Sequence, residues 1–568
     1  MSIISCIQIT RTSAKMCTTM DQEHSPTTIY INAYRSFLRA EGEMNIDQVI
    51  RLYQNMKPSI HKFADQEKVD VEAFMYAYLR LPPHIPQIQK IIMAQIGDIF
   101  VREGYKIEFW QEVHAPARRR KMYFDGDHKL AVFINSVTDL DDMVGLLTAF
   151  EIEWNKIHTK LKAVKDVSSK NKKEIQRALD IDEENWDRLA RIWDREIFDK
   201  LQDIKDHEVH FGLRLLRGNY VDYKKAAQRW FENIIEHTRY KELRNKPLYF
   251  VSSNTHSIVN NLTGWVNGLE HELIAYLEKN KSERFLSYWK QIEKGEHPGS
   301  KENFLWYILK KYEKDHPEIK EKREAYEKGL GIDFIDAKHY LDINAQVFSL
   351  KDFGKTNLSK KLGITEDKLN DSEALVLNID YPLGSGAYMV LSTILHNVND
   401  LRGVYILGKA SFLHANLGDI GLPTKVYDTY SNNTFIFNNS FTKDYFNEFK
   451  AGSVLTNQKV VSTKGTFLHP EEAIQQYFIE DYTIVEMEDG PYLSALYETT
   501  HFDRYPKDMT VTMLNAPIDI GIIHYASDTP FTKAITLGTR NLGYEGVEAT
   551  YASSLAILKR VIEVEMKR

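Results

Sequence analysis

The chain has 568 residues, more than one hydrophobic core usually supports, so we expect at least two domains. With 43% hydrophobic and 27% charged residues and a formal net charge of −7, it has the composition of a globular protein and gives no general reason to expect nucleic-acid binding. Its two cysteines, Cys6 and Cys17, exclude a disulfide framework and a cysteine-based zinc site.

The N-terminal stretch, residues 1–27, carries one short apolar run that is followed by Lys15 and polar residues. This pattern is a poor signal peptide, and we expect a disordered terminus. No apolar run approaches the roughly 20 residues that a membrane-spanning helix needs. The sequence therefore predicts a cytoplasmic protein without a membrane partner.

Residues 28–340 are predicted to form a mostly helical domain of unknown role. Apolar residues recur every three or four positions in the charged segments 160–205 and 313–328, a spacing typical of helices. Two stretches resemble strands instead: residues 129–135, and residues 247–251 followed by the polar turn Ser252–Ser257. That turn could bind an anion at a helix start, although a well-capped structural helix is the simpler interpretation.

Charged and metal-competent side chains in this half leave several roles open. The run Arg118–Lys121 could hold a phosphate or an effector nucleotide, or it could be a solvated face. The segments 151–158 and 207–210 contain histidines and glutamates, but they lack a spacing such as His-Glu-x-x-His, so we predict no metal site. Regulation and assembly remain the two candidate roles of this half, and we expect a homo-oligomer.

Shorter apolar segments begin after a boundary between residues 329 and 352, and they predict an α/β domain over residues 345–568. Residues 373–380 have the pattern of a buried strand, and Gly384-Ser385-Gly386 then opens a helix. Strand, small-residue turn and helix form a natural cradle for a phosphate or a ribose, because backbone amides can approach the ligand closely. Gly384 and Gly386 are therefore candidate substrate-binding residues.

Two later apolar runs each end at an acidic residue. The run 482–488 ends at Glu488, and the run 521–528 ends at Asp528. Open α/β folds bind their ligands at the carboxyl ends of buried strands, so both carboxylates are predicted to lie at one site. Glu488 can accept hydrogen bonds from sugar hydroxyls, and Asp528 can donate a proton to a leaving group.

The same residues carry a family resemblance. Val485–Glu488 on one strand and Ser527-Asp528 closing a later strand resemble the nucleoside phosphorylase and nucleosidase superfamily. The run Ser527–Pro530 followed by Ala534–Gly538 is most similar to its AMP nucleosidase branch. The resemblance covers roughly the last 220 residues and implies a three-layer α/β domain with a mixed sheet.

What the resemblance implies for function is hydrolysis of the N-glycosidic bond of a purine nucleotide or nucleoside, with AMP favoured. Asp528 would protonate or hydrogen-bond purine N7 as the base leaves, and Glu488 would hold the ribose hydroxyls. Met487 would pack beside the sugar, Gly408 would lie against the ligand, and Phe467 would stack on the base. Neither a metal nor another cofactor is required.

Departures from the family pattern keep two alternatives open. Lys409 stands where many members have a small residue, which favours a nucleotide-sensing or interaction protein on the same fold. Purine nucleoside phosphorolysis is the other alternative, and it is disfavoured because Ile406 stands where one phosphorolytic branch keeps an arginine.

The 5′ end of a nucleotide also needs cationic partners. The C-terminal domain supplies them only sparsely, at Lys409, Lys533 and Arg540. We therefore predict that the helical half helps to hold a phosphate, either of the substrate or of an effector.

Overall fold

The computed structural model describes residues 25–40, 42–216, 220–337, 341–364, 366–501, 504–528 and 546–568. Most of the predicted disordered terminus lies outside these residues, and Pro26 already begins helix α2. Residues 529–545 also lie outside them, and with them the Ala534–Gly538 part of the nucleosidase-like motif, Lys533 and Arg540.

The first half of the chain contains a six-stranded mixed sheet. Its strands, in spatial order, are β1 (Glu43–Asn45), β6 (Gly212–Leu215), β2 (Lys90–Ala94), β5 (Lys129–Phe133), β4 (Arg118–Phe124) and β3 (Gln111–Ala115). The predicted strand at residues 129–135 is β5, and the other five strands were missed. Each has only three to seven residues. In so short a segment, the alternation of apolar and polar residues that indicates a strand cannot be distinguished from a helical pattern. The prediction of a mostly helical domain therefore missed this sheet, although residues in helices outnumber those in strands here.

The helices of this part surround the sheet and one long central helix, α6, whose buried residues occur on all of its sides. They are α2 (Pro26–Ala40), α3 (Asp47–Met56), α4 (Val71–Tyr78), α5 (Gly97–Arg102), α6 (Val137–Leu161), α7 (Lys172–Leu179), α8 (Glu183–Trp193) and α9 (Ile197–Asp206). Of these, α7, α8 and α9 pack on α4, α6 and each other and not on the sheet. We call this part, residues 26–216, the small-sheet unit.

The second sheet has 11 strands and organises the rest of the chain. Ten of them lie in the order β16 (Thr510–Thr512), β13 (Asn433–Ile436), β12 (Ile420–Asp428), β14 (Val454–Ser462), β15 (Ile484–Glu486), β11 (Asp400–Phe412), β7 (Pro247–Ser253), β10 (Leu375–Asp380), β9 (Ala345–Ser349) and β8 (Asp333–Ile335). The eleventh, β17 (Asp519–Asp528), pairs in parallel with β11 and antiparallel with β12. We call residues 220–568 the large-sheet unit.

The position of β7 corrects the predicted domain boundary. This strand precedes residue 340, yet it pairs in parallel with both β10 and β11 in the middle of the large sheet. The helices α12 (Glu270–Lys279), α13 (Glu283–Glu293), α14 (Lys301–Asp315) and α15 (Pro317–Gly329) are inserted between β7 and β8 and have a core of their own. The charged pattern that suggested a domain end therefore belongs to an insertion within the α/β unit.

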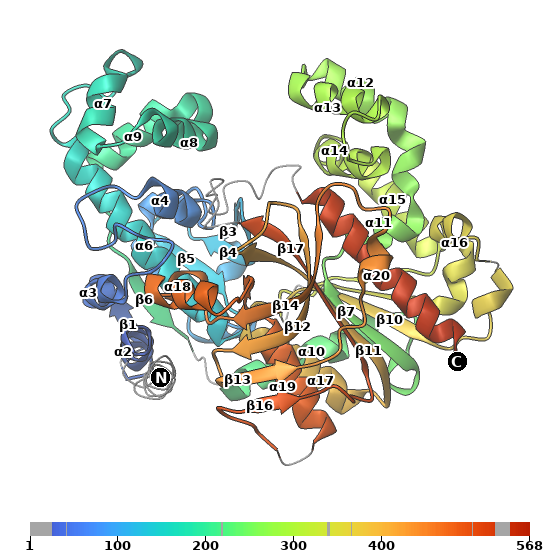
Figure 1. Cartoon of the computed structure of the whole chain (residues 1–568). Helices are drawn as coiled ribbons and strands as arrows, with labels where there is room; N and C mark the ends of the chain where they lie inside the picture. Colours follow the sequence, from blue (N-terminus) through green and yellow to red (C-terminus); the bar gives the residue numbers. More distant parts are fainter. Residues whose placement is uncertain are drawn as a thin grey trace, which may run out of the picture.

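Helices cover both faces of the large sheet, as Figure 1 shows. One face is covered by α10 (Tyr220–His237), α17 (Ser385–Asn397) and α19 (Asp489–Thr500), and the other by α11 (Ser257–Thr263), α16 (Asn357–Leu362) and α20 (Val547–Met566). Neighbouring residues of one strand supply opposite cores, because side chains alternate across a sheet: Phe250 packs on the first face and Tyr249 on the second. The mixed sheet between two helical layers is the architecture that we expected for the C-terminal part.

The segment between β14 and β15 connects the two units by packing against both of them. Helix α18 (Glu471–Ile479) follows β14, and the turn that precedes it packs against α6 in the core of the small-sheet unit. The two units therefore share a side-chain interface. Among the described helices, none combines the length and the apolar character that a bilayer crossing requires.

Candidate functional site

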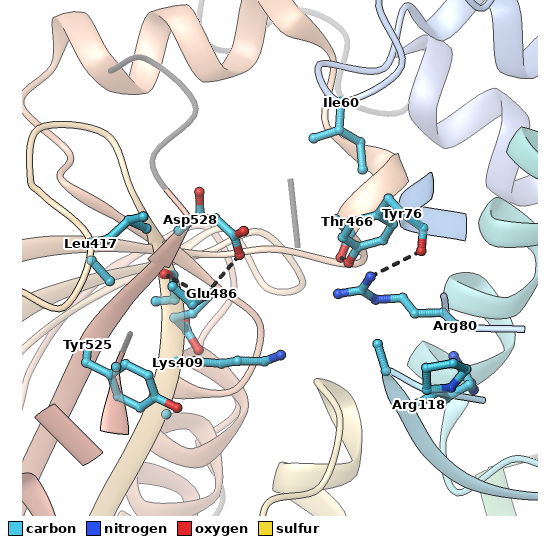
Figure 2. A pocket seen from close by; sticks show the side chains of 18 of the residues that line it. Ile60, Tyr76, Arg80, Arg118, Lys409, Leu417, Thr466, Glu486, Tyr525 and Asp528 are labelled. Carbon is cyan, nitrogen blue, oxygen red and sulfur yellow. Dashed lines mark hydrogen bonds between the residues drawn. The ribbon is translucent and has the colours of Figure 1, made fainter. Parts of the chain in front are cut away.

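A cavity of about 1640 Å³ lies between the two units. One wall consists of the carboxyl ends of β7, β11, β15 and β17, and the facing wall belongs to the small-sheet unit (Figure 2). The helix groups α7–α9 and α12–α15, at the upper left and upper right of Figure 1, contribute residues to its mouth. The strand ends thus open into a cavity with polar side chains on both sides.

Four of the predicted site residues line this cavity together: Asp528, Glu488, Met487 and Gly408. The sheet register explains why they meet. Ser411, near the end of β11, pairs with Asp528 of β17 on one side and with Val485 of β15 on the other. Two motifs that are far apart along the chain therefore flank the end of one strand.

Glu488 lies at the turn from β15 into α19. Its Oε1 accepts a hydrogen bond from the Gly384 N–H at 2.9 Å. Burial raises the pKa of Glu488 to about 7, although the Gly384 N–H favours the charged form, and the neighbouring Asp489 carboxylate adds to the increase. The Gly384 N–H thus occupies Oε1 of Glu488, and Oε2 can accept hydrogen bonds from hydroxyl groups in the cavity.

The glycine turn has a different role from the one predicted. Neither Gly384 nor Gly386 is among the residues that line the cavity. Gly384 has a φ of 50°, and a Cβ there would lie 2.5 Å from the Thr138 methyl carbon, so only glycine fits. A Cβ at Gly386 would lie 3.3 Å from Pro382. The two glycines lie outside the cavity lining, and the turn positions Glu488.

Phe467 is also placed differently from the prediction. Its side chain is 2% exposed and belongs to the core of the small-sheet unit. The ring lies edge-on to Tyr76, with centroids 5.4 Å apart, and its Cβ packs against Gly145 of α6. Its neighbour Thr466 lines the cavity, whereas Phe467 does not. The expected stacking on a base is therefore not supported by this geometry.

A buried ion pair beneath the site was missed by the sequence reasoning. His524 of β17 and Asp489 of α19 are 2% and 0% exposed, and His524 Nε2 lies 2.7 Å from Asp489 Oδ2. Burial opposes the charging of His524, but the Asp489 carboxylate outweighs it and raises the pKa of the imidazole. A histidine within an apolar run was the only sequence signal for this pair.

The nearby Glu486 is structural. Its carboxylate accepts hydrogen bonds from the Ser462 hydroxyl and from the backbone N–H of Asp489, the latter at 2.9 Å. Burial, together with the charges of Asp489 and Glu488, raises the pKa of Glu486 well above its usual value. These bonds hold the turn after β15 and thereby fix the direction of Glu488.

The polar turn after β7 caps a helix, as the simpler interpretation held. Asn254 Oδ1 accepts hydrogen bonds from the N–H groups of His256 and Ser257, at 3.0 and 2.7 Å, at the start of α11. Ser252, Ser253 and Asn254 nevertheless line the cavity, because β7 lies beside β11. The turn therefore belongs to the same site as Asp528, which the predicted domain boundary had hidden.

Basic residues face the strand ends from both walls. Figure 2 shows Lys409 and Arg80 pointing into the cavity from opposite sides. Arg80 is 8% exposed; its guanidinium lies 3.4 Å from the Tyr76 ring centroid and donates one hydrogen bond to the Tyr76 carbonyl. Neither Arg80 nor Lys409 has a carboxylate partner among the residues that the structure describes. Both cations are thus available to an anion in the cavity.

The predicted basic run Arg118–Lys121 is mostly neutralised by carboxylates. Arg118 bonds to Asp142, Arg120 bonds to Asp139, and the Lys121 ammonium lies 4.0 Å from Asp342. Arg118 lines the cavity with a side chain that is 6% exposed, and its Nη2 also lies 3.7 Å from Asp139 Oδ1. Among the described residues, its Nε and Nη2 have no hydrogen-bond partner, so Arg118 has hydrogen-bonding capacity left for an anion.

Comparisons with known proteins give a distant likeness in fold. No curated protein sequence matches the chain. The 5′-methylthioadenosine/S-adenosylhomocysteine nucleosidase from Neisseria meningitidis is 13% identical, and the match covers 41% of this chain and 90% of that one, with a TM-score of 0.28. The corresponding nucleosidase from Campylobacter jejuni is 10% identical over 41% and 90% of the two chains, with a TM-score of 0.28. Uridine phosphorylase from Vibrio fischeri is 8% identical over 40% and 83%, with a TM-score of 0.26.

A family model covers most of the chain, from residue 46 to residue 563. This range includes the large sheet, the small sheet except for its edge strand β1, and every described residue of the cavity. The chain therefore belongs to DUF6909, a family of unknown function.

Proposed function

We propose that the chain hydrolyses the N-glycosidic bond of a purine nucleotide or nucleoside, with AMP favoured. The observation that supports this proposal most directly is that Asp528 and Glu488 line one cavity at strand ends on either side of β11. Glycosidic cleavage needs a proton donor for the leaving group and groups that hold the sugar. The two carboxylates have the chemistry and the placement for these separate roles.

In the proposed reaction, Asp528 donates a proton to purine N7 as the bond between the sugar C1′ and base N9 breaks. The bonding electrons leave with the base, and a water molecule adds to the oxocarbenium-like carbon. The water loses one proton as it adds, and this proton restores the acid form of Asp528. Glu488 accepts hydrogen bonds from the ribose hydroxyls, and Met487 packs beside the ring. The His524–Asp489 pair lies below, and a protonated His524 would limit the repulsion between the carboxylates at the floor.

The cations around the cavity favour a nucleotide over a nucleoside. Arg80 and Lys409 point into the cavity and lack carboxylate partners among the described residues. Arg118 is ion-paired with Asp142 and Asp139, but its Nε and Nη2 make no hydrogen bond to a described residue. Guanidinium and ammonium groups are the side chains that best bind a phosphate. We assign these three residues to the 5′-phosphate, in place of the complete run Arg118–Lys121.

The test is to incubate the purified chain with AMP, adenosine or inosine, each with and without inorganic phosphate, and to measure the free base. We expect adenine from AMP without added phosphate. Base release only in the presence of phosphate would show a phosphorylase, and binding of AMP without release of any base would show a sensing protein. Either result would contradict the proposed hydrolysis.

A Lys409→Met variant should lower activity toward the nucleotide but not toward the nucleoside. A charge-assisted hydrogen bond contributes about 1.5–3 kcal/mol, so kcat/KM for AMP should fall roughly 10- to 100-fold, while kcat/KM for adenosine should stay within about twofold. Steady-state rates with both substrates measure this difference. Lys360→Met, at an exposed lysine of α16 outside the cavity, is the matched control. An equal loss with both substrates would remove Lys409 from the phosphate site.

A further inference from the structure

A second site is suggested by three side chains of the small-sheet unit that the proposed reaction does not use. Asp47 is the first residue of α3, Glu151 lies in the middle of α6, and His210 precedes β6. One ligand atom of each residue lies within 4.8 Å of the other two. None of the three lines the cavity. We propose that they bind a divalent transition-metal ion, with Zn²⁺ as the best fit.

The backbone holds the three segments in place. The Phe211 N–H donates to Glu151 Oε2 at 2.9 Å, and the Phe211 carbonyl accepts a hydrogen bond from the Ile46 N–H at 3.0 Å. The adjacent strands β1 and β6 pair antiparallel, with Asn45 opposite Gly212. Asp47 and His210 therefore each adjoin a residue that is fixed by a backbone hydrogen bond, and Glu151 accepts such a bond itself. Such preorganisation reduces the entropy that metal binding would otherwise cost.

Glu151 is the residue that indicates a cation. It is 1% exposed, and no Lys or Arg of the described chain forms an ion pair with it. Its Oε1 accepts no hydrogen bond from the described residues and points at His210, whose Nδ1 lies 3.6 Å away. A buried carboxylate without a cation is costly, because burial removes its hydration and the one Phe211 N–H replaces only part of it. A metal ion between Glu151 and His210 would supply the missing positive charge.

The donors and their spacing suit zinc. An imidazole nitrogen and carboxylate oxygens are both ligand types that Zn²⁺ accepts, whereas Mg²⁺ and Ca²⁺ prefer oxygen ligands alone. Tetrahedral ligands at about 2.0–2.1 Å from zinc lie roughly 3.3 Å from each other. The 3.6 Å between Glu151 Oε1 and His210 Nδ1 is close to that value. Asp47 and His210 are exposed, so the ion can enter from solvent and keep a water ligand.

The residues are 47, 151 and 210, so no short motif could reveal the site. The prediction of no metal rested on the missing short spacing. The folded chain brings the three ligands together through α3, α6 and the strand pair β1–β6. This inference is independent of the proposed hydrolysis.

The test is isothermal titration of the chelator-treated full chain with ZnCl₂, and with MgCl₂ as a second probe. We expect one Zn²⁺ per chain, and no Mg²⁺ binding at the same concentrations. His210→Ala, at an exposed position where folding is safe, should weaken Zn²⁺ binding at least tenfold, and Glu151→Gln should do the same. His207→Ala removes another exposed histidine that lies outside the cluster, and it should leave binding unchanged.

Several outcomes would overturn the site. These are no zinc binding by the native chain, native affinity in His210→Ala, and equal weakening in His207→Ala. Because the titration measures binding and not base release, a failed hydrolysis assay would leave its result intact. Glu151→Gln adds support if it folds, whereas His210→Ala decides the question by itself.

Discussion

An Asp528→Asn variant should release adenine from AMP about 100- to 10,000-fold more slowly than the native chain, because an amide cannot serve as the general acid. The change preserves the shape of a partly exposed side chain at the end of β17, where Ser527 donates a hydrogen bond to Oδ2. AMP binding should remain, since the proposed phosphate and ribose contacts come from other residues. Single-turnover rates and equilibrium binding measure the two quantities separately.

The matched control for this variant is Asp180→Asn. Asp180 also lines the cavity, but it lies at the C-terminus of α7 with a φ of 56°, a conformation that asparagine tolerates. Its substitution should leave adenine release unchanged. Native turnover in Asp528→Asn, or an equal loss in Asp180→Asn, would remove Asp528 from the proposed mechanism.

Asp489→Ala should lower the free energy of unfolding by about 3–5 kcal/mol, because it leaves His524 buried without its partner. The pKa of His524 is raised in the folded chain, so the stabilisation by the pair is fully present below the unfolded histidine pKa and is lost as pH rises through the folded pKa. The deficit of the variant should therefore be larger at pH 6 than at high pH. Urea unfolding at several pH values measures it.

The control for the second variant is Glu373→Ala, which breaks the exposed pair with Lys246. Solvent screens that pair, so its loss should change the unfolding midpoint far less. If both variants lost the same stability, or if the deficit of Asp489→Ala did not depend on pH, the charged His524–Asp489 pair would not be what stabilises the floor of the cavity.

Long buried strands could be predicted from the sequence. The patterns at residues 373–380 and 521–528 correspond to β10 and β17. Strands in the middle of a sheet are buried on both faces, so they appear as nearly continuous apolar runs. The acidic residues after such runs were likewise visible, and the candidate residues Asp528 and Glu488 followed from them.

The sheet partners and packing partners of those strands could not be predicted from the sequence. Strand β7 was recognised, but it was assigned to the wrong domain, because an insertion of four helices separates it from β10, its partner in the sheet. Phe467 follows a strand of the large sheet, yet its ring packs into the small-sheet unit. In both cases, the packing partner is a segment far away in the chain that has a complementary apolar surface. The local sequence pattern does not identify that segment.

What the sequence determined by itself was local: the buried strands, the turns that follow them and the two carboxylates at their ends. Only the tertiary structure decided that Arg80 faces Lys409 across the cavity, that Gly384 supports Glu488, and that His524 pairs with Asp489. The physical reason is that local periodicity reflects whether a residue is buried, whereas charge pairing and cavity walls depend on contacts between residues far apart in the chain.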